Sequence, residues 1–434
     1  MQLNSLVRQM ASTTSRVVEA AAPALDRVDS SVSLLWEGYQ FGTRRFARAG
    51  ADLFDTRLML TRATFTYGEE AARHFYTPDR LTRKGALPLP TLALLQDVGS
   101  VQVLDGAEHR HRKAMFLSMM TPTALDELVT LFERHWGEAE QRWAAQEHVV
   151  LLGGVHEVLC RTVCAWSGVP LAEEEVPQRT RQLVSMFEGA GAFGPRNWRG
   201  QLLRYSAEQW VRDLVEQVRS GRLDVAEGRP LHVVATHRGL DGELLSTAVA
   251  AVELINVLRP TVAIGRFIVF AALALHEHPE QRVGLTDDDA LCAFAQEVRR
   301  FYAFFPVVGG RVAEEFAWRD RTFRRGEWLL LDLYATNHDA RIWGDPEAFR
   351  PERFRERTPG PFDLVPQGGG DHATAHRCAG EWPTVRLLER AVGLLAALPH
   401  DVPPQDLTVD LTQMPTSPRS GMVVHVRGQS RPQA

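Results

Sequence analysis

Cysteine is scarce in this chain, whose 434 residues include only Cys160, Cys164, Cys292 and Cys378. Four cysteines are too few for a disulfide framework and are typical of proteins in a reducing compartment. Long apolar runs are also missing, since none reaches the roughly 18 residues that are needed to span a bilayer. The net charge of −5 provides no general attraction to nucleic acid or anionic membranes. These absences predict a soluble, cytoplasmic protein.

The chain also lacks internal repeats and low-complexity linkers, so nothing in its composition marks a domain boundary. Its length and its hydrophobic content of 44% fit one large helical domain or two ordinary ones. Residues 1–25 contain Arg8 and Arg16 but no acidic residue before Glu19, a pattern with some likeness to organelle-targeting peptides. We expect instead an amino-terminal extension over residues 1–25 and a single domain over residues 26–434.

The most distinctive stretch reads VPQGGGDHATAHRCAGEWPT. Its glycines, Gly368, Gly369 and Gly370, allow a loop to adopt positive φ angles or to bring its backbone close to a flat ligand. Cys378 follows, ahead of a predicted helix over Val385–Leu398 whose dipole favours a thiolate. Such a thiolate suits the axial position of a haem iron. The alternative is a buried structural cysteine beside an ordinary glycine-rich loop.

The run Leu244–Leu275 is hydrophobic on nearly every side and predicts a buried central helix. Glu253, Arg259 and Arg266 argue against a membrane span. Pro260 interrupts the helix, at a cost of about 3 kcal/mol or more. An unpaired buried charge such as Arg259 is also very costly. Its partner is either an acid elsewhere in the chain or the carboxylate of a ligand, held by the guanidinium fork.

Two groups of charged residues indicate a function less strongly than Cys378 and Arg259 do. His109 and Lys113 lie at i and i+4 on one face of a predicted helix, which is usually a solvated basic surface. Glu297 and Arg300 lie at i and i+3 on another helix, and exposed pairs of this kind contribute only about 0.2–0.5 kcal/mol. Arg353 follows later, in the sequence FRPERF. Neither group identifies a function by itself.

The glycine loop followed by HRCAGE resembles the haem-binding loop of the cytochrome P-450 superfamily. The QGGG at its start narrows the resemblance to the fatty-acid peroxygenase branch. The resemblance runs from about Asp26 to Arg427. It implies a mainly α fold with small peripheral β-sheets, the cytochrome P-450 fold, and one haem b whose iron is bound by Cys378.

The same resemblance implies roles for other residues. Haem contacts are implied for His109, Lys113, Gly368, Gly369, Gly370 and Arg377, with Arg112 as a further candidate. A buried structural network is implied for Glu297, Arg300 and Arg353. Gln102 would by itself be a strand residue with a hydrogen bond to make. The resemblance implies that it faces the distal side of the haem, where glutamine favours hydroxylation and histidine favours decarboxylation.

In this branch Arg259 and Pro260 stand where other members carry an acid and a hydroxyl residue that deliver protons to dioxygen. The resemblance therefore implies hydrogen-peroxide-dependent hydroxylation of long-chain fatty acids at the alpha or beta carbon, with minor decarboxylation to a terminal alkene. Arg259 would hold the substrate carboxylate, which would act as the general acid–base. No redox partner is expected. Two alternatives stay open: a reductase-dependent monooxygenase, and a non-catalytic protein that binds haem and fatty acid.

Local patterns add further expectations. β-branched and aromatic residues predict one strand over Arg57–Tyr67. Alternating apolar and polar residues predict strands over Leu407–Leu411 and Met422–Val426. Pro383 predicts that the helix after Cys378 begins later than usual, because proline is tolerated only near a helix start.

Overall fold

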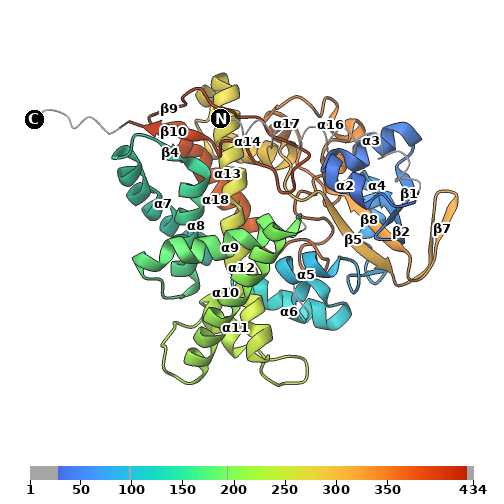
Figure 1. Ribbon diagram of the computed structural model, residues 1–434, viewed down its shortest axis with the longest axis horizontal. Helices are drawn as coiled ribbons and strands as arrows, with labels where there is room; N and C mark the ends of the chain where they lie inside the picture. Colours follow the sequence, from blue (N-terminus) through green and yellow to red (C-terminus); the bar gives the residue numbers. More distant parts are fainter. Residues whose placement is uncertain (1–27, 97–98, 193, 428–434) are drawn as a thin grey trace, which may run out of the picture.

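The computed structural model describes residues 28–96, 99–192 and 194–427. Within these residues helices form most of the molecule, and short β-strands gather at its edges (Figure 1). This arrangement agrees with the predicted mainly α fold with small peripheral sheets. The amino-terminal extension predicted over residues 1–25 lies outside the described residues, and the single domain over residues 26–434 stays a prediction.

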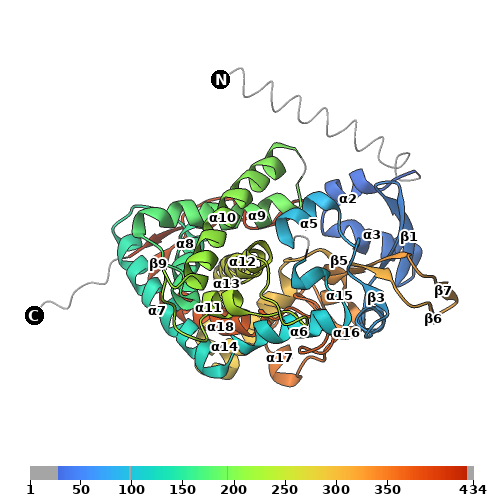
Figure 2. The same ribbon diagram turned by 90° about the horizontal axis from the view of Figure 1, so that it is seen from below.

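A long central segment, α12 (Thr247–Ala263) followed by α13 (Gly265–Glu277), runs through the helical part of the molecule (Figures 1 and 2). In the packed helices, buried residues recur at helical spacing, as with Leu128, Phe132 and Trp136. The helices that share this core are α6 (Gly106–Ser118), α7 (Pro122–Ala144), α8 (Leu151–Ser167), α9 (Val176–Ala190), α10 (Pro195–Arg219), α11 (Pro230–Thr236), α14 (Asp288–Phe301) and α18 (Glu381–Ala397).

The central segment differs from the single helix predicted over Leu244–Leu275. It breaks at Ile264, after Pro260 has removed one backbone donor from the last turns of α12. Gly265 then lets α13 lie close to α8, because a Cβ at this position would be 2.5 Å from Cδ2 of His156. The break therefore coincides with a close contact between the central segment and α8.

The central segment also corrects the expectation that no stretch is apolar enough for a membrane. Thr247–Glu277 passes by length and composition, but 94% of its most apolar window is buried inside the protein. Its charged residues Glu253, Arg259 and Arg266 are all buried as well. The segment is the core helix of this fold.

The largest sheet has the strand order β1-β2-β8-β5-β3 and contains one parallel pair, β2 with β8. Its strands are β1 (Leu53–Leu58), β2 (Thr61–Thr66), β3 (Leu81–Thr82), β5 (Val307–Val312) and β8 (Trp328–Asp332). Two smaller sheets contain β4 (Val149–Val150), β9 (His400–Asp401) and β10 (Val423–Val426), and β6 (Phe316–Trp318) with β7 (Arg321–Phe323).

Two strand predictions need correction. The strand predicted over Arg57–Tyr67 is two antiparallel strands, because Met59 and Leu60 adopt positive φ angles of 50° and 61° and turn the chain. The strand predicted over Leu407–Leu411 is reduced to an isolated bridge between Val409 and its partner on the returning chain. β-propensity located both regions but could not locate the turns.

Shorter elements link the large sheet to the helical part. Among them α5, η1 and α6 follow one another along the chain, and α5 and α6 lie between the sheet and α12 (Figure 1). The bounds are α2 (Ser31–Glu37), α3 (Gln40–Ala49), α4 (Glu69–Phe75), α5 (Leu89–Leu95), η1 (Val101–Val103), α6 (Gly106–Ser118), η2 (Glu173–Glu175), η3 (Pro279–Gly284), α15 (Leu333–Asn337), α16 (Ala340–Trp343) and α17 (Arg353–Glu356).

Candidate active site

Cys378 lies three residues before the amino end of α18. Its N–H donates to the carbonyl oxygen of Gln367 at 3.0 Å, which closes the loop around it. The helix begins at Glu381, so the prediction of a late start was wrong. Pro383 falls in the first turn, where a backbone N–H would have no partner within the helix. The sulfur therefore lies next to the free N–H groups of the helix.

The glycines before Cys378 are required by neighbouring protein groups. Gly368 and Gly370 have φ angles of +90° and +87°, which side chains rarely adopt. A Cβ on Gly369 would lie 2.7 Å from the carbonyl oxygen of Pro361, and one on Gly370 would lie 3.0 Å from Cβ of Tyr76. These contacts explain the three glycines without a ligand, so their predicted contact with haem stays a prediction.

Basic side chains from α6 hold the same loop. Lys113 donates through Nζ to the carbonyl oxygens of Ala375 and Arg377, each at 2.5 Å. The ring of His109 packs against that of His376, with 3.9 Å between centroids. Burial lowers the pKa of Lys113 to about 8 and that of His109 to about 4. Both residues therefore lie beside the cysteine loop.

A second cluster supports the loop from the side of α14 and α18. The carboxylate of Glu381 accepts from Nη2 of Arg299 at 2.5 Å and from Nη2 of Arg377 at 3.1 Å. Burial tends to raise the pKa of Glu381, but Arg299 and Arg377 lower it to about 2. Arg377 was predicted to contact haem, and the structure shows its guanidinium engaged with Glu381.

The electrostatics of Cys378 differ from the prediction. Burial raises the pKa of its thiol, although the N–H of Gly380 and the charges of Lys113 and Arg299 act in the opposite direction. The position at the helix amino end alone therefore does not produce a thiolate. A positively charged partner at the sulfur would be needed to hold the ionised form.

Arg259 on α12 is buried, with 5% of its surface exposed. Its Nη2 donates to Oδ1 of Asn256 at 2.8 Å, and its Nη1 donates to the carbonyl oxygen of Leu94 at 3.1 Å. Within residues 28–96, 99–192 and 194–427, no carboxylate lies within 4.0 Å of this guanidinium. Burial, helped by the charge of Arg204, lowers the pKa of Arg259 to about 9. The described protein therefore leaves this cation without an anion.

A hydrogen-bonded chain leads from Arg259 to η1. Asn256 donates through Nδ2 to Oε1 of Gln102 at 3.2 Å and to Oε2 of Glu253 at 3.1 Å. Oε1 of Glu253 accepts from Nη1 of Arg112 at 2.7 Å. Burial raises the pKa of Glu253 and Arg112 opposes that shift. Gln102 thus lies in a 3-10 turn, not in a strand, and is connected to Arg259 through one amide.

The roles of Glu253 and Asn256 in this chain were missed from the sequence. Glu253, Asn256 and Arg259 follow one another at intervals of three residues on an otherwise apolar helix, and that spacing was the available signal. Arg112 was a candidate for contact with haem, but its guanidinium forms a buried ion pair with Glu253. The distance in sequence between Arg112 and Glu253 hid this pairing.

Glu297, Arg300 and Arg353 form a buried cluster behind the cysteine loop. Glu297 accepts from Nη2 of Arg300 at 2.7 Å and from Nε of Arg353 at 3.3 Å through Oε1. The N–H of Arg350 also donates to this oxygen at 2.8 Å. The cluster joins α14 to α17.

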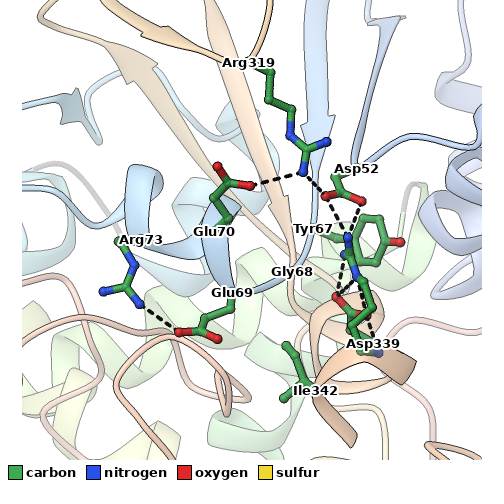
Figure 3. A pocket seen from close by; sticks show the side chains of 10 residues that line it. Asp52, Tyr67, Gly68, Glu69, Glu70, Arg73, Arg319, Asp339 and Ile342 are labelled. Carbon is green, nitrogen blue, oxygen red and sulfur yellow. Dashed lines mark hydrogen bonds and ion pairs between the residues drawn. The ribbon is translucent and has the colours of Figure 1, made fainter. Parts of the chain in front are cut away.

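A surface hollow at the far side of the large sheet has a different character. Arg341 pairs with Asp52 and Asp339, Arg319 pairs with Asp52 and Glu70, and Arg73 pairs with Glu69 (Figure 3). Each of these charges is satisfied by another in the hollow. The arrangement fastens the β6–β7 turn and α16 to the sheet and is separate from Cys378 and Arg259.

Comparison with known proteins places the chain in a family. A family model described as cytochrome P450 matches residues 290–381. Cytochrome P450SP alpha (CYP152B1), solved with (R)-ibuprophen, is 42% identical, with a TM-score of 0.90 over 92% of this chain and 100% of that one. Cytochrome P450EX alpha (CYP152N1), solved with myristic acid, is 43% identical, with a TM-score of 0.88 over 92% and 97% of the two chains. The chain belongs to the CYP152 branch of the cytochrome P450 family.

This membership confirms the predicted family, branch and fold of the P450. Matches to curated sequences are weaker. The putative cytochrome P450 138 of Mycobacterium bovis is 25% identical over 410 residues, which are 84% of this chain and 88% of that protein. Cytochrome P450 4e5, mitochondrial, from Drosophila mettleri is 31% identical over 77 residues, which are 18% of this chain and 15% of that relative. Outside this branch the likeness is therefore either low in identity or short. As a P450, the protein is an oxidoreductase with a haem cofactor.

The residues present fit a haem in this P450. Cys378, Ala379 and Gly380 are only partly buried, so the protein does not fully cover this part of the loop. The ferric charge of a haem iron would supply the cation that the Cys378 thiolate needs. Cys378 is therefore the residue that would hold the iron.

Proposed function

We propose that this P450 is a peroxygenase that hydroxylates long-chain fatty acids at the alpha or beta carbon. Fatty acid and hydrogen peroxide would give a 2- or 3-hydroxy acid and water. The observation that carries the proposal is the Arg259 guanidinium, buried on the central helix with no carboxylate among the described residues within ion-pair distance. A substrate carboxylate would complete this ion pair.

The ligands of the two CYP152 relatives support the substrate class. Myristic acid and (R)-ibuprophen, named with P450EX alpha and P450SP alpha, are both carboxylic acids. An arginine binds a carboxylate through two parallel hydrogen bonds and so fixes its orientation. We therefore assign Arg259 as the group that binds the acid end of the substrate.

The central helix of this P450 offers no obvious side chain to deliver protons to a bound oxidant. Arg259 is followed by Pro260, and the hydroxyl of Thr261 donates to the carbonyl oxygen of Val257 at 2.8 Å. A substrate carboxylate held at Arg259 would provide the missing acid–base group, because a carboxylate can take a proton from peroxide and return it. The substrate would thus take part in its own oxidation, and no redox partner would be required.

Each residue then has a defined task. Haem, when bound, supplies the oxidising chemistry, and Cys378 would be its iron ligand. Arg259 fixes one end of the fatty acid, so that only the first carbons of the chain are close to the iron. Gln102 is joined to Arg259 through Asn256. It would face the distal side of the haem and favour hydroxylation, with terminal alkene as a minor product. Cytoplasmic location belongs to the same proposal.

Replacement of Arg259 by alanine tests this function. The Arg259→Ala protein should bind haem normally but lose peroxide-driven oxidation of palmitic acid. Loss of one charge-assisted hydrogen-bond pair, at about 1.5–3 kcal/mol per bond, corresponds to at least a hundredfold fall in kcat/KM. Turnover equal to that of the unaltered protein would exclude Arg259 as the carboxylate-binding residue. Arg212→Ala, a change on the outer part of α10, is the matched control.

A further inference from the structure

Glu253 is a fully buried carboxylate on α12, six residues before Arg259. The N–H of Val101 and Nη1 of Arg112 donate to its Oε1, at 2.9 Å and 2.7 Å. Nδ2 of Asn256 donates to its Oε2 at 3.1 Å. All three partners are donors, and an ionised carboxylate is the side chain that only accepts. The surroundings of Glu253 therefore match its charged form.

This carboxylate determines which way the Asn256 amide faces. If Oδ1 of Asn256 faced Glu253, two acceptors would meet, so the NH₂ group must point to Glu253. Oδ1 then points to the other side, where Nη2 of Arg259 donates to it at 2.8 Å. A donor at that position would repel the guanidinium. The orientation of Arg259 is thus set by a carboxylate that does not touch it.

The orientation of the Asn256 amide also determines the orientation of the Gln102 amide. The second hydrogen of the Asn256 NH₂ group is directed to Oε1 of Gln102, at 3.2 Å. Because Oε1 of Gln102 accepts this hydrogen bond, the NH₂ group of Gln102 points away from Asn256. In the part of the chain that the structure describes, Nε2 of Gln102 has no hydrogen-bond partner, and Gln102 is partly accessible. The NH₂ group of Gln102 is therefore an available hydrogen-bond donor on a residue that is connected to Arg259 through Asn256.

We infer that Glu253 is a positioning residue for the carboxylate of the substrate. By fixing the Asn256 amide, Glu253 holds the Arg259 guanidinium in place and turns the NH₂ end of Gln102 toward the bound acid. Its ion pair with Arg112 and its bond to Val101 also tie α6 and η1 to the central helix. The inference rests on the proposed function, because it requires a carboxylate at Arg259.

Glu253→Gln separates this role from a merely structural one. On one side the NH₂ end of the new side chain would meet two donors, the N–H of Val101 and Nη1 of Arg112, and on the other side it would meet only Asn256, so it faces Asn256. Asn256 then has to turn, and its NH₂ group meets Arg259. Isothermal calorimetry of the haem-loaded protein should show an increase of about tenfold in Kd for lauric acid. The Kd of 1-dodecanol, which carries no charge, should change by less than about twofold, because a neutral ligand does not use the cation.

Two further variants complete the experiment. Asn256→Leu removes the connecting amide while Glu253 keeps its ion pair, and it should reproduce the loss for the acid even if Glu253→Gln does not fold. Glu216→Gln, on the exposed side of α10, should leave both ligands unaffected. The inference is overturned by unchanged binding of lauric acid in Asn256→Leu or in folded Glu253→Gln, or by equal losses for acid and alcohol.

Arg259→Ala distinguishes the failure of this inference from failure of the proposed function. If Arg259→Ala binds lauric acid as tightly as the unaltered protein, the proposed function is wrong. If Arg259→Ala loses the acid while Glu253→Gln and Asn256→Leu keep it, only the positioning role of Glu253 is wrong.

Discussion

Arg259→Met should make the protein more stable while it abolishes binding of the acid. Burial lowers the pKa of Arg259 from 12.5 to about 9. At about 1.4 kcal/mol per pKa unit, the folded state carries an unfavourable charge worth about 5 kcal/mol. Below about pH 9 both the folded and the unfolded protein carry this charge, so the cost is fully present between pH 6 and pH 8, and it is lost as the pH rises above about 9.

Methionine removes the charge and keeps most of the volume. The carbonyl oxygen of Leu94 still accepts from Nη1 of Arg204 at 2.8 Å. Oδ1 of Asn256 loses its donor, which costs about 1–3 kcal/mol. The net gain is about 2–4 kcal/mol, within the range of about 1–4 kcal/mol for apolar replacement of buried ions. With about 2.1 cal/mol/K per residue, this is about 2–4 °C in melting temperature.

Differential scanning calorimetry of the haem-loaded protein without fatty acid checks the result. Saturating palmitic acid should raise the melting temperature of the unaltered protein and leave that of Arg259→Met unchanged. A fall of several degrees in Arg259→Met without fatty acid would refute the reasoning, because it would show that the protein itself compensates the charge. The matched control is Arg212→Met, whose guanidinium is more exposed.

Three other changes test separate parts of the account. Gln102→His should raise the share of terminal alkene among the products, measured by gas chromatography, and an unchanged ratio would remove Gln102 as a determinant. Glu297→Gln breaks a buried cluster with Arg300 and Arg353 and should cost about 3–5 kcal/mol in urea unfolding; a loss below about 1 kcal/mol would contradict that role. Burial raises the pKa of Asp332 to about 7. Because the folded state holds this proton more tightly, stability should fall as the pH rises from about 4 to 7, and Asp332→Asn should reduce the total fall over this range by up to about 4 kcal/mol. Equal slopes in the two proteins would exclude Asp332 as the cause.

Much of the helical core could be predicted because its apolar pattern is dense. The run that became α12 and α13 was recognised as buried, although the break at Ile264 depends on close contact of Gly265 with α8, which no local pattern records. The hairpin turn at Met59 and Leu60 was missed because the residue types at this turn do not indicate one. Neither residue is a usual turn former, and their positive φ angles are imposed by pairing of β1 with β2.

The candidate site was predicted as a set of motifs, and the connections between them were not. Cys378 and Arg259 were identified from a loop pattern and from one charge in an apolar run. Arg112 and Arg377 were predicted to contact haem, and their pairings with Glu253 and Glu381 were not anticipated. The predicted haem contacts stay predictions. Pairings between distant segments depend on three-dimensional packing, so the sequence spacing alone could not reveal which acid each arginine would meet.

The central claim is that this P450 oxidises a fatty acid bound at Arg259 with hydrogen peroxide alone. The most direct measurement mixes purified, haem-loaded protein with palmitic acid and hydrogen peroxide, without reductase, and analyses the products by gas chromatography and mass spectrometry. The account predicts 2- or 3-hydroxypalmitic acid in the unaltered protein and none above background in Arg259→Ala. Product formation that requires a reductase and dioxygen, with none from peroxide, would contradict it.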